Sequence, residues 1–442
     1  MAESSSQKMT VTQLTIITAV NMMGSGIIML PSKLAQVGTE SVLSWLVTLG
    51  GALCLSYGFA RCGMFSENTS NGMGGYAEYA FGKNGNFMAN FTYALSLVIA
   101  NVAIGVSAVG YGAVCLGIEL NAVQTSLATM ALVIITTLAN FWGPSITGKI
   151  GSVTVWGVII PVVLISVVGW FFFSGHKYAA AWNPHHLSFG KAIGSSIPIT
   201  LWSFLGLESA AANGDAVDNP QKNVPIAILS GTIVAGIIYI ASTNVMAGIV
   251  DNKDLVTSTA PFGLAFATMF HSAMAGKIVM ALMTLACIGS LLGWQFTVAE
   301  VFRSSANAGY FPAVFKKLNK HDAPVAGMTI LMIVQLILSL MTMSPNLNEQ
   351  FNQLVNIAVI TNLVPYVLCM AAVKIIQIRA GQTDSKAKTA NAIAFVAGLY
   401  SLYSMYACGA ESMLIGAIIA FFGWTVWGFI AHNFMPLGKE SK

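Results

Sequence analysis

The sequence predicts an all-α integral membrane protein. Of its 442 residues, 56% are hydrophobic and only 8% are charged, whereas a soluble domain carries roughly a quarter charged residues. Apolar runs near 20 residues recur along the whole chain, which is the length that a helix needs to cross a bilayer. The polar stretches between them are too short for a separate catalytic domain. We therefore expect one membrane transporter domain over residues 1–442.

Twelve apolar spans can be counted, each separated from the next by polar or Gly- and Pro-rich residues. They cover residues 10–36, 41–63, 86–118, 123–143, 149–173, 193–213, 224–250, 276–303, 325–343, 352–377, 389–407 and 412–434. With the N-terminus in the cytoplasm, 15 of the 20 lysines and arginines fall in inner segments, and Lys33 is among the five in outer segments. Because basic residues prefer the cytoplasmic side, we expect both termini there.

Glu208 is the only carboxylate in the middle of an otherwise uncharged span. An ionised, unpaired carboxylate is costly at that depth, so such residues are usually functional. Gly206 precedes it and allows the helix to unwind. Glu208 can therefore form a charge-assisted hydrogen bond with an amine ligand or bind a proton in its place. A protonated acid bonded to a backbone carbonyl is the structural alternative.

The first span carries a second break at residues 24–26, Gly-Ser-Gly, preceded by Asn21 and followed by Pro31. Freed N–H groups at the start of the second half-helix favour a carboxylate, although small residues also serve close helix packing. Breaks in spans one and six predict a five-plus-five inverted repeat. Its halves would be residues 10–173 and 193–377, with two extra helices in residues 389–434.

Four further side chains are candidates for the same site. Trp202 and Trp294 lie inside spans, away from the interfaces where tryptophan is enriched, and an indole can pack on an alkyl chain or face an ammonium. Tyr93 and Asn101 lie eight residues apart in span three and so on one helix face. Packing against lipid or neighbouring helices is the alternative for all four.

Several classes of function lack their usual residues. There is no Walker A motif, HExxH or GxSxG, so ATP-driven transport and hydrolysis are not expected. The six cysteines show no CxxC pairing, and we expect neither a metal nor another cofactor. Basic patches with interleaved aromatic residues are also absent, so a nucleic-acid partner is not expected.

Several motifs resemble one family of transporters along essentially the whole chain. They are NMMGSGI (21–27), GGYAEYAFG (74–82), WSFLGLES (202–209), NPQKNVP (219–225), STAPFGLAFA (258–267) and GSLLGWQFT (289–297), together with residues 95–111. In this order they resemble the amino acid–polyamine–organocation superfamily and, within it, the basic amino acid/polyamine antiporters. Trp427 and Met435 depart from that branch, where a Tyr and a Glu are expected.

The resemblance implies a role for each candidate residue. Glu208 would meet an ammonium group, with Asn101 in the same pocket and Tyr93 as an outer gate element. The remaining implied positions are Gly24, Ser25 and Gly26 for the carboxylate or backbone amine, Trp202 and Trp294 for the aliphatic chain, and Cys62, Glu78 and Tyr310 for transport or gating.

The resemblance also implies a function. The expected activity is exchange of putrescine for ornithine by alternating access in a bacterial inner membrane, with lysine/cadaverine and arginine/agmatine as alternative pairs. Proton-driven uptake, with Glu208 as the protonation site, is a second mode. A homodimer is compatible with the resemblance. A sensor or a channel is a further alternative, but broken helices at the midplane do not favour a continuous pore.

Overall fold

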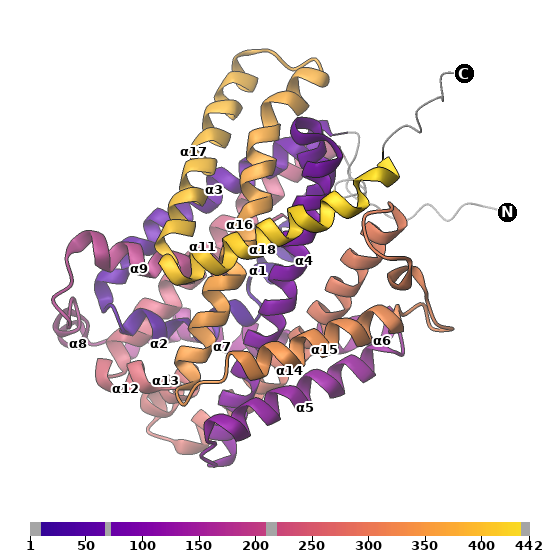
Figure 1. Ribbon diagram of the computed structural model, residues 1–442. Coiled ribbons are helices and arrows are strands. Elements are labelled where there is room, and N and C mark those ends of the chain that lie inside the picture. Colours follow the sequence, from indigo (N-terminus) through magenta and orange to yellow (C-terminus); the bar gives the residue numbers. More distant parts are fainter. Residues whose placement is uncertain (1–9, 67–71, 209–218, 435–442) are drawn as a thin grey trace, which may run out of the picture.

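The computed structural model describes residues 10–66, 72–208 and 219–434, and every regular element in these ranges is a helix (Figure 1). In this part of the chain, eight segments are long and apolar enough to cross a membrane. They lie in α3 (Val42–Phe65), α4 (Gly72–Leu116), α5 (Ala122–Asn140), the consecutive α6 (Pro144–Thr154) and α7 (Trp156–Val168), α11 (Pro220–Ile249), α14 (Ala273–Asn307), α16 (Leu347–Arg379) and α18 (Ala410–Ile430).

The other four predicted spans are also helical where they are described, but are interrupted, shorter or less apolar. They are α1 (Val11–Met22) with α2 (Leu30–Ala35), α9 (Phe189–Trp202), α15 (Val325–Met341) and α17 (Ser385–Ala407). The count of twelve membrane crossings therefore stays a prediction. The structure does show a multi-pass helical protein.

Two local features differ from the simple spans expected from the sequence. The fifth span begins at Pro144 and consists of two helices, α6 and α7, the second of which contains Pro161. Residues 72–82 are the first part of α4, and the helix is interrupted at Gly82, where φ is +63°. Proline lacks a backbone donor and glycine tolerates positive φ, so both sites deviate for local reasons.

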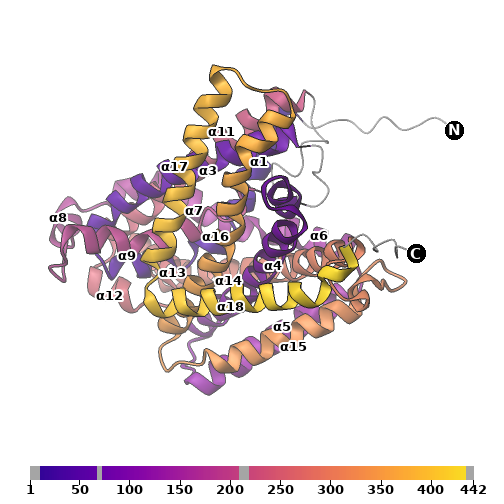
Figure 2. The same cartoon turned by 45° about the horizontal axis from the view of Figure 1, so that its top comes forward.

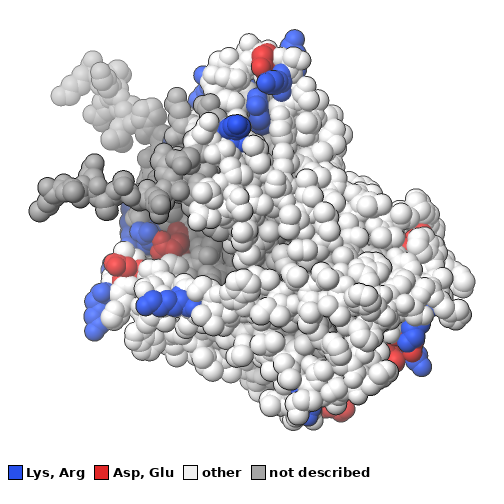
Figure 3. Space-filling model, turned by 180° about the vertical axis from the view of Figure 1, so that it is seen from behind, with Lys and Arg blue, Asp and Glu red and all other residues white. Residues whose placement is uncertain are grey.

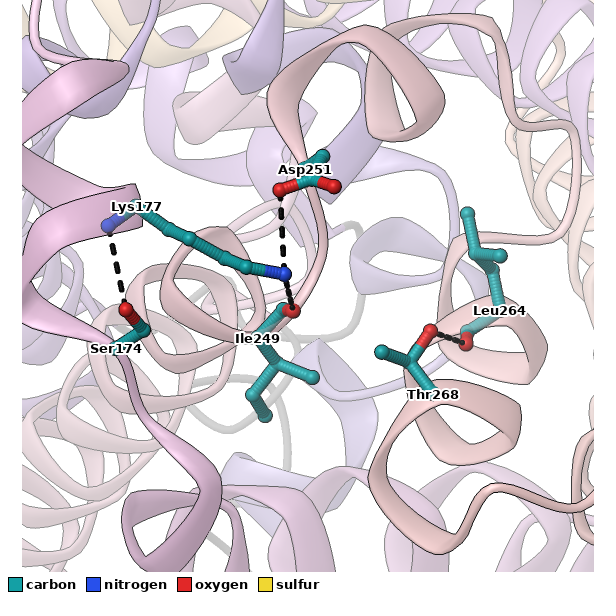
Figure 4. Close-up of polar contacts among 6 residues, drawn as sticks. All are labelled: Ser174, Lys177, Ile249, Asp251, Leu264 and Thr268. Carbon is teal, nitrogen blue, oxygen red and sulfur yellow. Dashed lines mark hydrogen bonds and ion pairs between the residues drawn. The ribbon is translucent and has the colours of Figure 1, made fainter.

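Short helices connect the long ones. They are α8 (Gly175–Ala180), α12 (Asn252–Thr257), α13 (Pro261–Phe270) and the 3-10 turns η1 (Ser25–Ile27), η2 (Thr39–Ser41), η4 (Gly169–Phe172), η6 (Ala313–Lys316) and η7 (Ala431–Phe434). Lys177 of α8 pairs with Asp251 at 3.2 Å and donates to the carbonyl of Ile249 at 3.2 Å (Figure 4). These bonds attach α8 to the end of α11.

The long helices pack as two groups. One, the bundle group, contains α1, α3, α9 and α11, and the other, the scaffold group, contains α4, α5, α14 and α15. Helix α16 contacts both groups, and α5 and α15 lie side by side at one edge (Figures 1 and 2). The cavity described below lies where the two groups and α16 meet.

The surface fits a lipid environment. In Figure 3 a broad uncharged area separates charged side chains that gather toward the edges of the molecule. Large apolar side chains stand exposed on several helices, among them Phe171 and Phe429 at 84% and 78%. Apolar surface on this scale marks contact with a membrane or another protein.

Candidate functional site

The first helix is broken where the sequence predicts it. Helix α1 ends at Met22, a short 3-10 turn follows, and α2 begins at Leu30. The break frees backbone carbonyls that would be costly to bury unpaired. The hydroxyl of Tyr111 in α4 donates to one of them, the carbonyl of Ile28, at 2.9 Å. The backbone of Ser25 lies in the turn, and its side chain lies outside the described part.

The second break begins where α9 ends, at Trp202. The chain then turns through Gly206, whose φ of +104° is a conformation that other residues rarely adopt. The hydroxyl of Tyr239 in α11 donates to the freed carbonyl of Ser203 at 3.0 Å. Residues 209–218 lie outside the described part, so the sixth predicted span is followed only as far as Glu208.

The two breaks touch each other through their glycines. A Cβ atom on Gly26 would lie 3.2 Å from Cα of Ser203, which is tighter than most real contacts. A Cβ atom on Gly206 would lie 3.5 Å from the carbonyl oxygen of Asn21. The glycines therefore allow the two unwound segments to approach closely, as a shared site between broken helices requires.

A small cavity of about 50 Å³ lies at this junction. Of the residues predicted for the site, its walls contain Asn21, Gly24, Gly26, Trp202, Gly206, Glu208 and Trp294. Helices α4 and α16 supply the other walls, including Ser96 and Asn362, whose side chains bond to each other at 3.1 Å. Most of the lining is apolar, and Glu208 is the only charged side chain that the described residues contribute to it.

Glu208 is buried, with 7% of its surface exposed, and three neutral groups donate to its carboxylate. The hydroxyl of Tyr93 donates to one oxygen at 3.1 Å. The N–H of Gly206, at 3.1 Å, and the hydroxyl of Tyr366 donate to the other. In the described part of the chain, no cation forms an ion pair with it. A carboxylate held by neutral donors beside a cavity favours a cationic ligand.

The cavity continues toward one side of the molecule. A second, larger hollow of about 430 Å³ shares Asn21, Gly24 and Trp294 with it and runs between α6 and α14. Ser152 and Thr297 on its walls are exposed, so the hollow reaches the surface. On the opposite side, residues 27–30 are fully buried. The structure is therefore open on one side of the cavity and closed on the other.

Asn101 does not line the cavity, although the sequence placed it in the pocket. It follows the lining residue Ala100 in α4 and is fully buried. Within the described residues, neither atom of its side-chain amide has a hydrogen-bond partner. A buried amide without hydrogen-bond partners costs free energy. Asn101 is therefore an unusual residue, although it does not line the cavity.

Cys62, Glu78 and Tyr310 also lie away from the cavity walls. Cys62 donates to the carbonyl of Cys369, three residues after Tyr366, at 3.8 Å. Glu78 pairs with Lys83 at 2.5 Å. Cys62 thus contacts the helix that carries Tyr366, whereas Glu78 forms a local ion pair.

Tyr310 stacks on Phe434 with ring centres 4.6 Å apart and lies 6.3 Å from Trp427. Trp427, one of the two departures noted in the sequence, is therefore part of an aromatic cluster with Tyr310. Met435, the other, lies outside the described residues. Among the described residues, no three His, Cys, Asp or Glu side chains gather as a metal site.

Sequence reasoning missed Tyr366. It follows Pro365 in the tenth predicted span, and a tyrosine beside a proline inside an apolar span is the signal that was available. Its partner Glu208 lies 158 residues away, so nothing in the local sequence indicates their contact.

Broken helices around a buried cavity that opens on one side, with one carboxylate and mostly apolar walls, are typical of membrane transporters. The family model described as amino acid permease matches residues 9–435, and the chain belongs to that family. It is therefore a transporter and not an enzyme.

Three relatives whose names describe transporters or antiporters match most or all of this chain. The chain is 60% identical over 441 residues to "Putrescine transporter PotE" of Escherichia coli (strain K12), with 100% of both chains covered. It is 58% identical to the protein of the same name from Haemophilus influenzae, with 97% of this chain and 98% of that one covered. It is also 34% identical to the "Cadaverine/lysine antiporter" of Escherichia coli (strain K12), with 82% of each covered.

Proposed function

We propose that this transporter exchanges putrescine for ornithine across a bacterial inner membrane. The observation that carries the proposal is Glu208, a buried carboxylate with neutral donors in a mostly apolar cavity. An ammonium group would supply the missing positive charge. The names of the relatives that match the whole chain support putrescine, and the antiporter with lower identity supports exchange of a diamine for its amino acid.

In this proposal the two breaks bind different ends of the substrate. Glu208 meets an ammonium, and Trp202 and Trp294 enclose the aliphatic chain between them. Backbone N–H groups of residues 24–26 face the other end, either a carboxylate or a second amine. The buried indole N–H of Trp202 has no partner among the described residues, and it is a further donor on the cavity wall. Asn101, Cys62, Glu78 and Tyr310 would act on the transport cycle from outside the walls.

Alternating access would follow from movement of one helix group against the other. The bundle group would rock against the scaffold group, as in five-plus-five inverted repeats. The proposal also includes the inverted repeat, the twelve membrane spans and a homodimer that forms through α17 and α18. The open hollow would face the cytoplasm, because Lys149 of α6 and Arg303 of α14 lie on that side by the distribution of basic residues. Tyr93 would then lie on the cytoplasmic side, and not at the outer gate.

Counterflow in proteoliposomes tests the exchange. Vesicles loaded with unlabelled putrescine should accumulate labelled ornithine, whereas vesicles loaded with buffer alone should not. Lysine, arginine and agmatine, added as competitors, would reveal whether another pair is the preferred one. Equal uptake into loaded and unloaded vesicles would exclude obligatory exchange.

Proton-driven uptake is the second candidate, because no cation pairs with Glu208 among the described residues and a proton can occupy it instead. Unloaded vesicles with an imposed pH gradient provide the test. Putrescine accumulation that collapses when a protonophore is added would establish this mode alongside exchange.

A further inference from the structure

Lys33 is a buried lysine on the closed side of the cavity, and the site described above does not use it. Its sequence position suggested a charge in an outer segment, but it lies in α2 and only 4% of its surface is exposed. The ammonium donates to the backbone carbonyl of Asn348 in α16 and lies 5.9 Å from the centre of the Phe351 ring. No ion pair joins it to a carboxylate in the described part of the chain, and Glu349 attracts it only at longer range.

The elements that line the cavity continue past it toward Lys33. Ile104 of α4 and Ala358 of α16 are cavity walls. At 1.5 Å per residue, Tyr111 lies about 10 Å further along α4, and Asn348 lies about 15 Å further along α16. Because Lys33 bridges α2 to Asn348, its ammonium lies beyond the Tyr111 layer, between α2 and α16, the helix that contributes Ala358 to the cavity wall. A substrate that leaves between α2 and α16 would separate this contact.

Polar atoms surround the same point. Ser32 donates to the carbonyl of Ser258 at 2.7 Å, and the side-chain amide of Asn348 donates to that carbonyl at 3.4 Å. In the described residues, the side-chain oxygen of Asn348 is buried without a partner. Unpaired polar atoms are costly in a closed contact, and water or a polar substrate would satisfy them once it opens.

We propose that Lys33 is a specificity-determining residue of the closed face. When α2 separates from α16, its ammonium loses the carbonyl of Asn348 and stands at the entrance to the cavity. There it attracts the carboxylate of an amino acid and repels a diamine, which carries two positive charges. Entry from this face therefore favours the amino acid over the diamine. The inference rests on the proposed exchange function.

Right-side-out and inside-out membrane vesicles, each loaded with unlabelled putrescine, test this inference. KM is measured for labelled ornithine and labelled putrescine in the wild type, Lys33→Met and Lys33→Arg. In Lys33→Met the ratio of KM for ornithine to KM for putrescine should rise about tenfold on one face only, as expected for unit charges about 10 Å apart in partly hydrated protein. Lys33→Arg keeps the charge and should keep the wild-type ratio.

Lys253→Met is the matched control, because Lys253 of α12 is exposed and should leave both constants unchanged. Should Lys33→Met not reach the membrane, Lys33→Gln keeps a donor for the Asn348 carbonyl and provides the same comparison. A ratio within twofold of wild type on both faces, or equal changes in Lys33→Met and Lys33→Arg, overturns the inference. A wild-type protein that exchanges neither substrate overturns the proposed function as well.

Discussion

The two helix breaks solve the same backbone problem in the same way. Each frees a buried carbonyl, that of Ile28 in the first break and that of Ser203 in the second. Each carbonyl accepts a hydrogen bond from a tyrosine of a different helix, Tyr111 at 2.9 Å and Tyr239 at 3.0 Å. Irregular backbone at membrane depth is tolerated only when its polar groups are satisfied, so these tyrosines are part of the architecture of the breaks.

The breaks differ in charge. Residues 22–30 of the first break contain no ionisable side chain and offer mainly backbone and small residues to the cavity. The second break places Glu208 there, held by Tyr93, Tyr366 and the N–H of Gly206. One side of the cavity thus offers neutral backbone and the other a carboxylate. This asymmetry lets one cavity distinguish the two ends of a substrate.

Removing the charge should have the largest effect on this asymmetry. Glu208→Gln keeps the size of the side chain but removes the partner of an ammonium, a loss that costs about 2–5 kcal/mol at buried ion pairs. We expect kcat/KM for putrescine exchange to fall more than about thirtyfold, measured by counterflow in proteoliposomes. Glu119→Gln, an exposed carboxylate between α4 and α5, is the control and should exchange normally. Near-normal exchange by Glu208→Gln would exclude the carboxylate as the ammonium site.

Straining the second break should have the next largest effect. Gly206→Ala must adopt a φ of +104°, which costs about 1–3 kcal/mol in residues with a Cβ. We expect lower thermal stability in detergent and exchange reduced roughly tenfold, because the strain displaces Glu208. Gly50→Ala is the matched control, since Gly50 lies inside α3 with no atom near the added methyl. Gly50→Ala should stabilise the protein. Equal losses of stability and exchange in Gly50→Ala and Gly206→Ala would contradict a special backbone conformation at Gly206.

The breaks themselves could be predicted from the sequence, because glycine and a lone carboxylate are local signals. Gly24, Gly26, Gly206 and Glu208 all line the cavity. Trp202 also lines the cavity. It lies one and a half turns before Glu208, so the position of the break also determines where this side chain lies. The sequence was sufficient for the helix breaks because each break is formed by residues that are neighbours in the chain.

Contacts between distant helices could not be predicted in this way. Tyr366 reaches Glu208 across 158 residues of sequence, and Lys33 reaches Asn348 across 315. Lys33 was counted among the outer residues from its place near the end of the first span, and that count gave no sign that α2 buries it against α16. The family resemblance implied Asn101 in the pocket, and helix periodicity fixes only the face of α4 on which it lies, not the edge of the cavity. These positions depend on how helices pack.

The tyrosines that hold Glu208 should contribute less than the charge itself. A hydrogen bond to a charged group is worth about 1.5–3 kcal/mol, so Tyr366→Phe should raise KM for putrescine roughly tenfold. Tyr93→Phe removes a bond to the other oxygen of the same carboxylate and should act in the same direction. The double variant should lose less than the sum of the two, because both act through one group. Additive losses would indicate that the tyrosines contact the substrate independently of Glu208.

The smallest effects should come from the two tyrosines that cap the freed carbonyls, and these should differ between the breaks. Tyr239→Phe leaves the carbonyl of Ser203 without that donor, at a cost of about 1–3 kcal/mol. Tyr111→Phe removes the same kind of bond from Ile28 and also the acceptor for the N–H of Phe262, at 3.3 Å. We therefore expect Tyr111→Phe to lower the melting temperature in detergent more than Tyr239→Phe does.

Tyr111 lies on the side opposite the open hollow. If its hydrogen bond keeps that side closed, Tyr111→Phe should make a cysteine placed at Ser258 react faster with a thiol reagent. Tyr239→Phe should leave that labelling unchanged. Equal labelling of the two variants would mean that Tyr111 supports the backbone of the first break without keeping that side closed.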